Sequence, residues 1–329
     1  MADLQVRYVS LHVELVGRGY PLLLMHGGPG ADHHSLLAFR RLADRHTLVF
    51  YDHRCNGRSA GVPLTTMTWD NLTADAEALR RRLGIERWAV LGHSFGGHVA
   101  LEYALRYPGS ASHLVLLDTG ADARWARENA PRILAARGYG PGTVALARRF
   151  FTGRIRPGEM RQGLMRFGGA YYHRAGIRLL AREVIEQRGT TMRPEALIFA
   201  GQHLLDGWSV TDRLGELRVP TLVIAGRDDF IFPPESQVEL ARAIPGARLR
   251  IVERSGHNAH AERPAEVMSA VRELLEVPIA PSPVATAARP SAPPRSRGRA
   301  AARSDGRGGG RDQPSQASAA SATVVDGGA

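Results

Sequence analysis

Residues 92–96 read Gly-His-Ser-Phe-Gly and lie between an apolar run, Trp88–Leu91, and a helix-like stretch, Gly97–Arg106. This order predicts a sharp turn from a strand into a helix, with Ser94 at its tip. Glycine on both sides of the tip avoids a collision between a side chain and the neighbouring backbone. A serine held in this way projects its hydroxyl above the sheet, where a histidine can reach it. The stretch therefore predicts an α/β fold with a reactive serine.

The rest of the chain alternates short apolar runs with amphipathic segments. Strands are predicted at Leu11–Val16, Leu22–Met25, Leu48–Tyr51, Trp88–Leu91, Leu114–Leu117, Thr221–Ala225 and Leu249–Val252. Helices are predicted at Ser35–Ala43, Asp70–Leu83, Glu235–Ala243 and Pro264–Leu275. Such alternation predicts a mostly parallel sheet with helices on both faces. Between the first two runs, Gly17-Arg18-Gly19 predicts a β-hairpin and thus an antiparallel edge of the sheet.

The alternation stops between residues 119 and 218, where we predict only helices. These helices are expected at Pro131–Gly138, Thr143–Phe151, Glu159–Phe167, Gly176–Gln187 and Glu195–Leu205. A helical insertion at the place where a cleft would open predicts a lid, residues 119–218, over an α/β core made of residues 1–118 and 219–277. Residues 278–329 consist largely of Pro, Ala, Ser, Arg and Gly, a composition that predicts a disordered tail.

Composition and charge narrow the functional classes. The chain has 329 residues, of which 43% are hydrophobic, as is typical of a globular protein. A single cysteine, Cys55, excludes an intramolecular disulfide and, with no signal-like N-terminus, predicts a cytoplasmic protein. No apolar run reaches the roughly 18 residues of a membrane span. The net charge of +11 comes from 43 basic residues, all arginine, without a dense block in the body of the chain, so nucleic-acid binding is not predicted.

A serine hydroxyl is a weak nucleophile and needs a base that is itself oriented by an acid. His257 follows the last predicted strand and can lie at the same edge of the sheet as Ser94. Asp228 and Asp229 follow the strand Thr221–Ala225, and we prefer Asp229 as the acid, with Asp228 as the alternative. The resulting chain order of serine, aspartate and histidine is the one expected for a hydrolase of this architecture.

The oxyanion of an acyl-transfer reaction needs backbone N–H donors that are already in place. The N–H of Phe95, directly after the serine, is the first candidate. The second is the N–H of Gly28, in the glycine-rich loop that follows the strand Leu22–Met25. Several other histidines are expected to be packed or on the surface: His53, His98, His113, His173 and His203.

Five motifs in order resemble the α/β-hydrolase superfamily over roughly Leu11–Leu275, and within it the proline iminopeptidase-like group (serine peptidase family S33 type). They are His26-Gly27-Gly28-Pro29-Gly30, Asp52-His53-Arg54-Cys55-Asn56-Gly57-Arg58-Ser59, Gly92–Gly97, Gly226–Asp229 and Ser255-Gly256-His257. The chain departs from that group at Cys55, His93 and Phe95, where Gly, Gly and Trp are usual. The resemblance implies a cofactor-free serine hydrolase that forms an acyl-Ser94 intermediate. Arg54 and Arg58 are expected to hold loops in place.

An iminopeptidase also binds a protonated N-terminal amine, normally through carboxylates of the lid. Glu183 and Glu186 can share a helix face and are candidates, although ion pairs with nearby arginines are an alternative. Tyr171 and Tyr172 could line an apolar substrate pocket, as could Trp125, Phe150 and Phe151, or they could pack the lid.

Other functions remain open on the sequence alone. A carboxylesterase, a lactonase or a C–C bond hydrolase of small molecules would use the same serine chemistry. A non-catalytic ligand receptor could keep this fold, and an interaction protein could act through the arginine-containing tail. We expect a small-molecule or short-peptide substrate, no cofactor and no metal, because no phosphate loop, dinucleotide motif or complete metal-ligand set occurs. The oligomeric state is not predicted.

Overall fold

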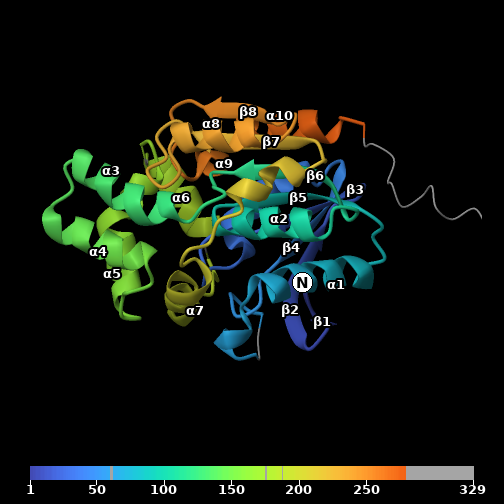
Figure 1. The fold of residues 1–329 in the computed structure, drawn as a ribbon, viewed down its shortest axis with the longest axis horizontal. Coiled ribbons are helices and arrows are strands. Elements are labelled where there is room, and N and C mark those ends of the chain that lie inside the picture. Colours follow the sequence, from blue (N-terminus) through green and yellow to red (C-terminus); the bar gives the residue numbers. More distant parts are fainter. Residues whose placement is uncertain (60–61, 175, 187, 279–329) are drawn as a thin grey trace, which may run out of the picture. The chain divides into compact units, whose positions relative to one another are not determined.

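Eight strands form one mixed, mostly parallel sheet in the computed structural model, which describes residues 1–59, 62–174, 176–186 and 188–278 (Figure 1). The order across the sheet is β1-β2-β4-β3-β5-β6-β7-β8. The strands are β1 (Ala2–Val6), β2 (Val9–Val16), β3 (Tyr20–Met25), β4 (His46–Tyr51), β5 (Trp88–His93), β6 (Ala111–Leu117), β7 (Thr221–Gly226) and β8 (Arg248–Val252). Strands β3 to β8 are parallel, whereas β2 is antiparallel to both β1 and β4. The predicted fold class and the antiparallel edge are confirmed.

The predicted hairpin between the first two apolar runs is wrong. Strand β2 pairs with β4, and β3 lies on the far side of β4, parallel to it. The four apolar residues of the second run, Leu22–Met25, are fully buried, which requires neighbours on both sides and helices on both faces. Gly17 and Gly19, with φ of +83° and +123°, therefore lead the chain across the start of β4 rather than into a hairpin.

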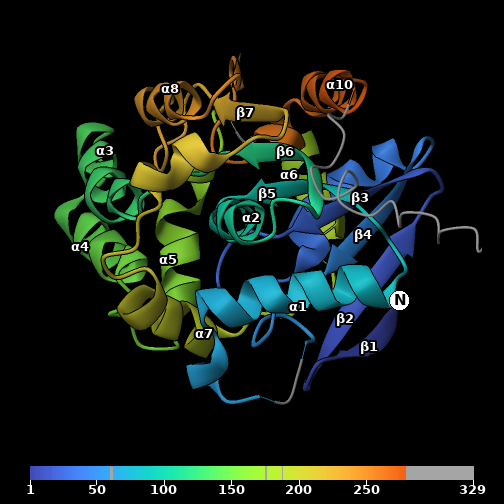
Figure 2. The ribbon, with the colours of Figure 1, turned by 45° about the vertical axis from the view of Figure 1, so that its right-hand side comes forward.

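Side chains of the central strands alternate between two apolar layers. In β3, Leu23 and Met25 face one layer, and Leu22 and Leu24 face the other. The first layer is covered by α1 (Trp69–Arg82), α2 (Phe95–Arg106) and α8 (Pro234–Ala243). The second is covered by the 3₁₀ helix His33–Leu42 and by α10 (Pro264–Leu275), on the opposite side of the sheet from α1 and α2 (Figure 2). Both faces of the sheet are thus buried.

A helical insertion, residues 119–218, separates β6 from β7, as the sequence predicted. Its α-helices are α3 (Ala130–Ala136), α4 (Pro141–Phe151), α5 (Glu159–Phe167), α6 (Ile177–Glu186) and α7 (Pro194–Phe199). Helices α3, α4 and α5 lie together to one side of the sheet (Figures 1 and 2). Their buried side chains share a cluster with Phe230 and Phe232 from the loop after β7, so this loop joins the insertion to the sheet.

The predicted division into core, lid and tail stays a prediction, and the tail beyond Pro278 lies outside the described residues. Within the part of the chain that the structure describes, no helix has both the length and the apolarity needed to cross a membrane.

Candidate active site

Ser94 stands at the tip of the turn between β5 and α2 with φ of +53° and ψ of −121°. This backbone conformation is strained for a non-glycine residue and is concentrated at functional sites. The backbone N–H of Ser94 donates to the carbonyl of Leu117 at 3.0 Å, and the Thr119 hydroxyl donates to the carbonyl of Ser94 at 2.7 Å. A Cβ on Gly96 would collide with the carbonyl oxygen of Met25. The end of β6, the Gly96 position and β3 therefore fix the strained turn.

His257 lies in the loop between β8 and the short helix α9 (Ala259–Glu262). Its Nδ1 is 2.9 Å from Oδ2 of Asp229, and both side chains are almost completely buried. The other carboxylate oxygen of Asp229 accepts the backbone N–H groups of Ile231 and Phe232 at 2.7 and 3.2 Å. With Asp229 ionised, Nδ1 of His257 carries the proton, which leaves Nε2 as the basic nitrogen.

The neighbouring Asp228 has a different partner. Its carboxylate is 2.6 Å from Nδ1 of His173, and its backbone carbonyl accepts a guanidinium N–H of Arg137 at 2.7 Å. Both contacts tie the end of β7 to the helical insertion. Of the two carboxylates that the sequence offered, the structure brings Asp229 to His257 and Asp228 to the insertion.

A third carboxylate, Asp118, lies beside this pair and was missed in the sequence. It follows β6 directly, is fully buried, and accepts the backbone N–H groups of Gly226 at 2.7 Å and Ala259 at 3.3 Å. Burial and the charge of Asp229 raise the pKa of Asp118 well above its usual range. Asp118 thus connects the loop of Asp229 to the loop of His257. Its position at a strand end, after an apolar run, was the signal that could have identified it.

The glycine-rich loop after β3 lies at the same edge of the sheet. Gly28 has φ of +58°, and its carbonyl accepts the N–H of Ala31 at 2.8 Å. Gly28 and Phe95 both line the cavity described below, as does Ser94. The two residues whose N–H groups were selected from the sequence therefore border the same cavity as Ser94, and their role stays a prediction.

The segment after β4, which begins at Asp52, contains several buried polar contacts. Asp52 accepts the N–H of His33 at 2.9 Å and that of Arg58 at 2.8 Å. Burial opposes ionisation of Asp52, but its bond to the His33 ring and the nearby imidazoles hold its pKa well below the usual range. Arg54 is buried and makes two 2.7 Å hydrogen bonds to Asp75. Cys55 is buried and is not among the described residues that line the cavity.

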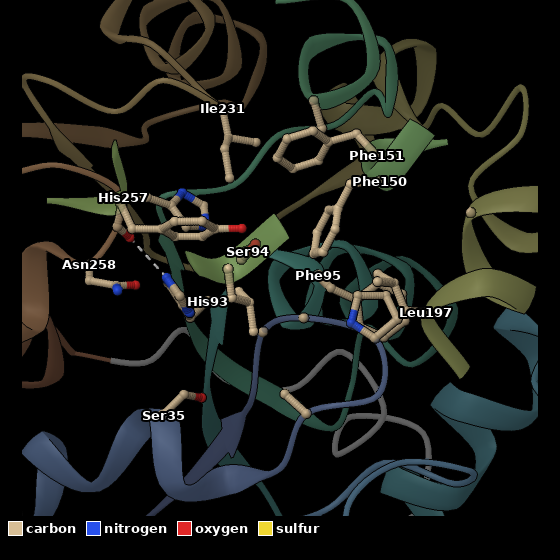
Figure 3. Close-up of a pocket in the computed structure, with 18 of the residues that line it drawn as sticks. Ser35, His93, Ser94, Phe95, Phe150, Phe151, Leu197, Ile231, His257 and Asn258 are labelled. Carbon is tan, nitrogen blue, oxygen red and sulfur yellow. Dashed lines mark hydrogen bonds between the residues drawn. The ribbon is translucent and has the colours of Figure 1, made fainter. Parts of the chain in front are cut away.

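A cavity of about 480 Å³ opens between the turn at Ser94 and the helical insertion. Ser94, His257 and Asn258 border it on the sheet side, and Phe150, Phe151 and Ile231 surround the space next to Ser94 (Figure 3). Further apolar lining comes from Phe95, Met160, Leu164, Met192, Leu197, Leu205 and Phe232. The only carboxylate among the described lining residues is Asp32, which already accepts the N–H groups of His34 and Thr191 at 3.0 and 2.7 Å. The cavity suits an apolar group.

Of the four residues of the insertion selected from the sequence, Tyr171 and Tyr172 line this cavity. The ring of Tyr171 packs edge-on against His257 with the centroids 5.5 Å apart. The Tyr172 hydroxyl donates to Glu183 at 3.2 Å, and Glu183 lines a smaller adjoining pocket of about 250 Å³. Glu186 faces Arg182 at 3.9 Å and is not among the cavity residues.

The insertion also contacts the histidine loop directly. The carbonyl of Tyr171 accepts the backbone N–H of Asn258 at 3.2 Å. The same carbonyl lies so close to Gly256 that a Cβ there would be only 2.5 Å from it. The backbone around residue 171 therefore rests on the backbone that holds His257.

Three buried side chains near His257 bring potential metal-ligand atoms within 4.8 Å of one another: His93, Asp118 and His260. Each already has backbone partners, since His93 and His260 donate to the carbonyls of His257 and Ser35 at 3.0 and 2.8 Å. The expected absence of a metal stays a prediction.

The sequence profile of the alpha/beta hydrolase fold family matches residues 20–264. The chain therefore belongs to this family, and the match covers both the sheet and the helical insertion.

Three relatives illustrate the range of similar proteins. A proline iminopeptidase of Pestalotiopsis fici is 27% identical over 264 residues, which cover 78% of this chain and 92% of the relative. The crystal structure of proline iminopeptidase from Mycobacterium smegmatis is 26% identical with a TM-score of 0.65, covering 83% of this chain and 97% of that one. A thermophilic esterase from Thermogutta terrifontis is 27% identical with a TM-score of 0.60, covering 81% and 93%. Peptidases and esterases thus both occur among the similar proteins.

Proposed function

We propose that this protein is a cofactor-free serine hydrolase that works through an acyl-Ser94 intermediate. Ser94 attacks the carbonyl carbon of the substrate, and Nε2 of His257 accepts the serine proton and then donates it to the leaving group. Asp229 orients the imidazole and stabilises its charged form. The N–H groups of Gly28 and Phe95 bind the oxyanion of the tetrahedral intermediate. Water then cleaves the acyl-enzyme, with His257 as the base.

The observation that carries this proposal is the buried 2.9 Å contact between His257 and Asp229 beside the strained turn of Ser94. An isolated buried carboxylate would be costly, whereas one that accepts an imidazole N–H and two backbone N–H groups is stabilised. Ser94 and His257 border one apolar cavity, so a substrate carbonyl can meet both.

The lining of the cavity favours an ester with an apolar acyl group as the substrate. Phe150, Phe151 and Ile231 surround the space next to Ser94. A protonated amine buried there would need a carboxylate to balance its charge, and the one carboxylate among the described lining residues, Asp32, already accepts two backbone N–H groups.

The test is covalent labelling with a fluorophosphonate probe and turnover of p-nitrophenyl esters. Native protein should be labelled and should turn over an ester faster than about once a minute, whereas Ser94→Ala should lose both properties. Ser269→Ala, which changes an exposed serine of α10 that bonds to Glu273, serves as the matched control and should behave as the native protein. Labelling of the Ser94→Ala protein would reject the assignment, and a native protein without turnover would favour a ligand receptor.

A second candidate function is the release of N-terminal proline from short peptides. Two iminopeptidases among the relatives and the position of Glu183 at the adjoining pocket favour it. On this hypothesis the Glu183 carboxylate binds the substrate amine, and Glu183→Gln raises KM for proline naphthylamide by at least about tenfold. Good turnover of esters with none of proline naphthylamide would exclude this second function.

A further inference from the structure

A second pocket, of about 480 Å³, lies where the helical insertion meets the loop of His257. Arg174 and Arg182 line it from the insertion, and Arg254 and Arg263 line it from the chain on either side of His257. We call it the arginine pocket after these four residues. None of its described lining residues belongs to the wall of the apolar cavity. The arginine pocket is therefore separate from the candidate active site, and its volume is in the usual range for a small-molecule site.

The positive charge of the arginine pocket is not balanced by its own wall. Glu262 is the one carboxylate among the described lining residues, and it accepts the backbone N–H groups of His173 at 3.1 Å and Gly256 at 2.7 Å. Arg174 and Arg254 are exposed, and their side chains make no hydrogen bond or ion pair within the described part of the chain. Guanidinium groups that face one space without carboxylate partners repel one another and attract an anion.

The other two arginines of the pocket are only partly occupied. Arg182 donates to the carbonyl of Ala261 and lies 3.9 Å from Glu186, and its side chain remains 30% exposed. Arg263 makes one long hydrogen bond, of 3.4 Å, to the carbonyl of Glu253. Because a guanidinium group has five N–H donors, both side chains keep donors for a ligand.

The start of α6 adds to this positive character. Gly176, directly before α6, lines the arginine pocket, and the first turn of the helix contains no acidic residue. The N-terminal end of a helix carries partial positive charge and N–H groups without helical partners, which favours phosphate oxygens. Arginine binds the same oxygens through paired N–H bonds. Four arginines and one glutamate leave an excess of positive charge that a diphosphate group can neutralise.

The arginine pocket also spans the contact between the insertion and the histidine loop. Three residues before Arg174, the carbonyl of Tyr171 accepts the backbone N–H of Asn258. On the other wall, Glu262 accepts the N–H of Gly256, directly before His257. A ligand that binds arginines from both walls would therefore hold the two segments together.

We infer that the arginine pocket is a binding site for a soluble small molecule that carries a diphosphate group, and that the bound ligand fastens the helical insertion to the histidine loop. Arg174 and Arg254, one on each wall, are the principal ligand-binding residues. The site does not depend on the serine chemistry of the proposed function, because its residues are not those of the candidate active site.

The first experiment measures the binding of inorganic pyrophosphate by calorimetry at constant ionic strength. Native protein should bind one pyrophosphate per chain, at least about tenfold more tightly than inorganic phosphate. The double variant Arg174→Gln/Arg254→Gln should raise the Kd for pyrophosphate at least about tenfold.

The matched control is the double variant Arg18→Gln/Arg161→Gln, which removes the same charge from two exposed arginines that line neither the apolar cavity nor the arginine pocket. Its Kd should stay within about twofold of the native value. Equal weakening in the two double variants would mean general attraction of anions to a positively charged protein and would overturn the site, as would the absence of saturable binding.

Hydrogen exchange with and without saturating pyrophosphate tests the fastening. The amides of Gly256 and Asn258, which bond to Glu262 and to Tyr171, should exchange at least about fivefold more slowly in the complex. Binding without slower exchange would overturn the fastening. Ser94→Ala should bind pyrophosphate as the native protein does, so the outcome is independent of turnover. A failure of binding would leave the hydrolase function intact, and a failure of turnover would leave the arginine pocket intact.

Discussion

The stability of the folded protein should fall on mild acidification because of its buried neutral histidines. Burial lowers the pKa of His98 to about 3 and that of His260 to about 4, whereas an unfolded histidine titrates near 6.5. Between these values the unfolded chain binds protons that the folded protein does not bind. The free energy of unfolding therefore rises with pH through this window, is fully present above about pH 6.5, and is lost as the pH falls.

The magnitude follows from the pKa shift. One pH unit inside the window corresponds to about 1.4 kcal/mol for each histidine, so a change from pH 7 to about pH 5 should cost about 2 kcal/mol through His98 alone. His98→Leu removes this titration, and the variant should lose about 2 kcal/mol less than the native protein over the same interval.

The assay is urea denaturation of both proteins at the two pH values, followed by tryptophan fluorescence and by circular dichroism. The informative quantity is the difference between the two pH dependences, because the leucine changes packing equally at both pH values. If native protein and His98→Leu lose the same free energy of unfolding within about 0.5 kcal/mol, His98 is not held neutral and the argument from its burial fails.

Three further predictions concern the site and the chain that supports it. Gly96→Ala should reduce ester turnover at least about tenfold, because the added Cβ would push β3 and the serine turn apart. Its control is Gly109→Ala, where the added Cβ meets open space, and this variant should turn over esters at the native rate. Asp229→Asn should lower kcat by roughly 10⁴-fold with little change in KM, since an amide favours the wrong tautomer of His257, and a loss below tenfold would contradict the assigned role. A chain that lacks residues 279–329 should retain the native kcat/KM for esters, because the cavity and its site lie between residues 27 and 258; a large loss would assign a role to the tail.

Much of the fold could be predicted because the relevant signals are local. Short runs of four to six residues, rich in apolar side chains, identified seven of the strands, and the end of each parallel strand placed its following loop at one edge of the sheet. Ser94, Asp229 and His257 follow β5, β7 and β8 in this way, which is why residues far apart in the chain could be grouped from sequence order alone.

What the sequence did not reveal depends on long-range packing. Strand β2 pairs with β4 rather than with β3 because both faces of β3 are buried at the centre of the sheet. The glycines between β2 and β3 indicate a turn, but they do not indicate which strand β2 pairs with. Strand β1 is mostly exposed, and its alternation of apolar and polar residues covers only five positions. Asp118 is a single polar residue after an apolar stretch, and its position beside Asp229 depends on backbone N–H groups that the distant residues Gly226 and Ala259 bring to it.

The contact between Tyr171 and the histidine loop limits how this protein can diversify. In a modular enzyme, a new lid could be exchanged onto an unchanged catalytic scaffold. Here a transplanted insertion would have to supply a backbone carbonyl to the N–H of Asn258 and leave room for the close approach at Gly256. An insertion without these contacts would displace His257 as well as reshape the cavity, so under the proposed function a new substrate preference could not be acquired without also affecting His257.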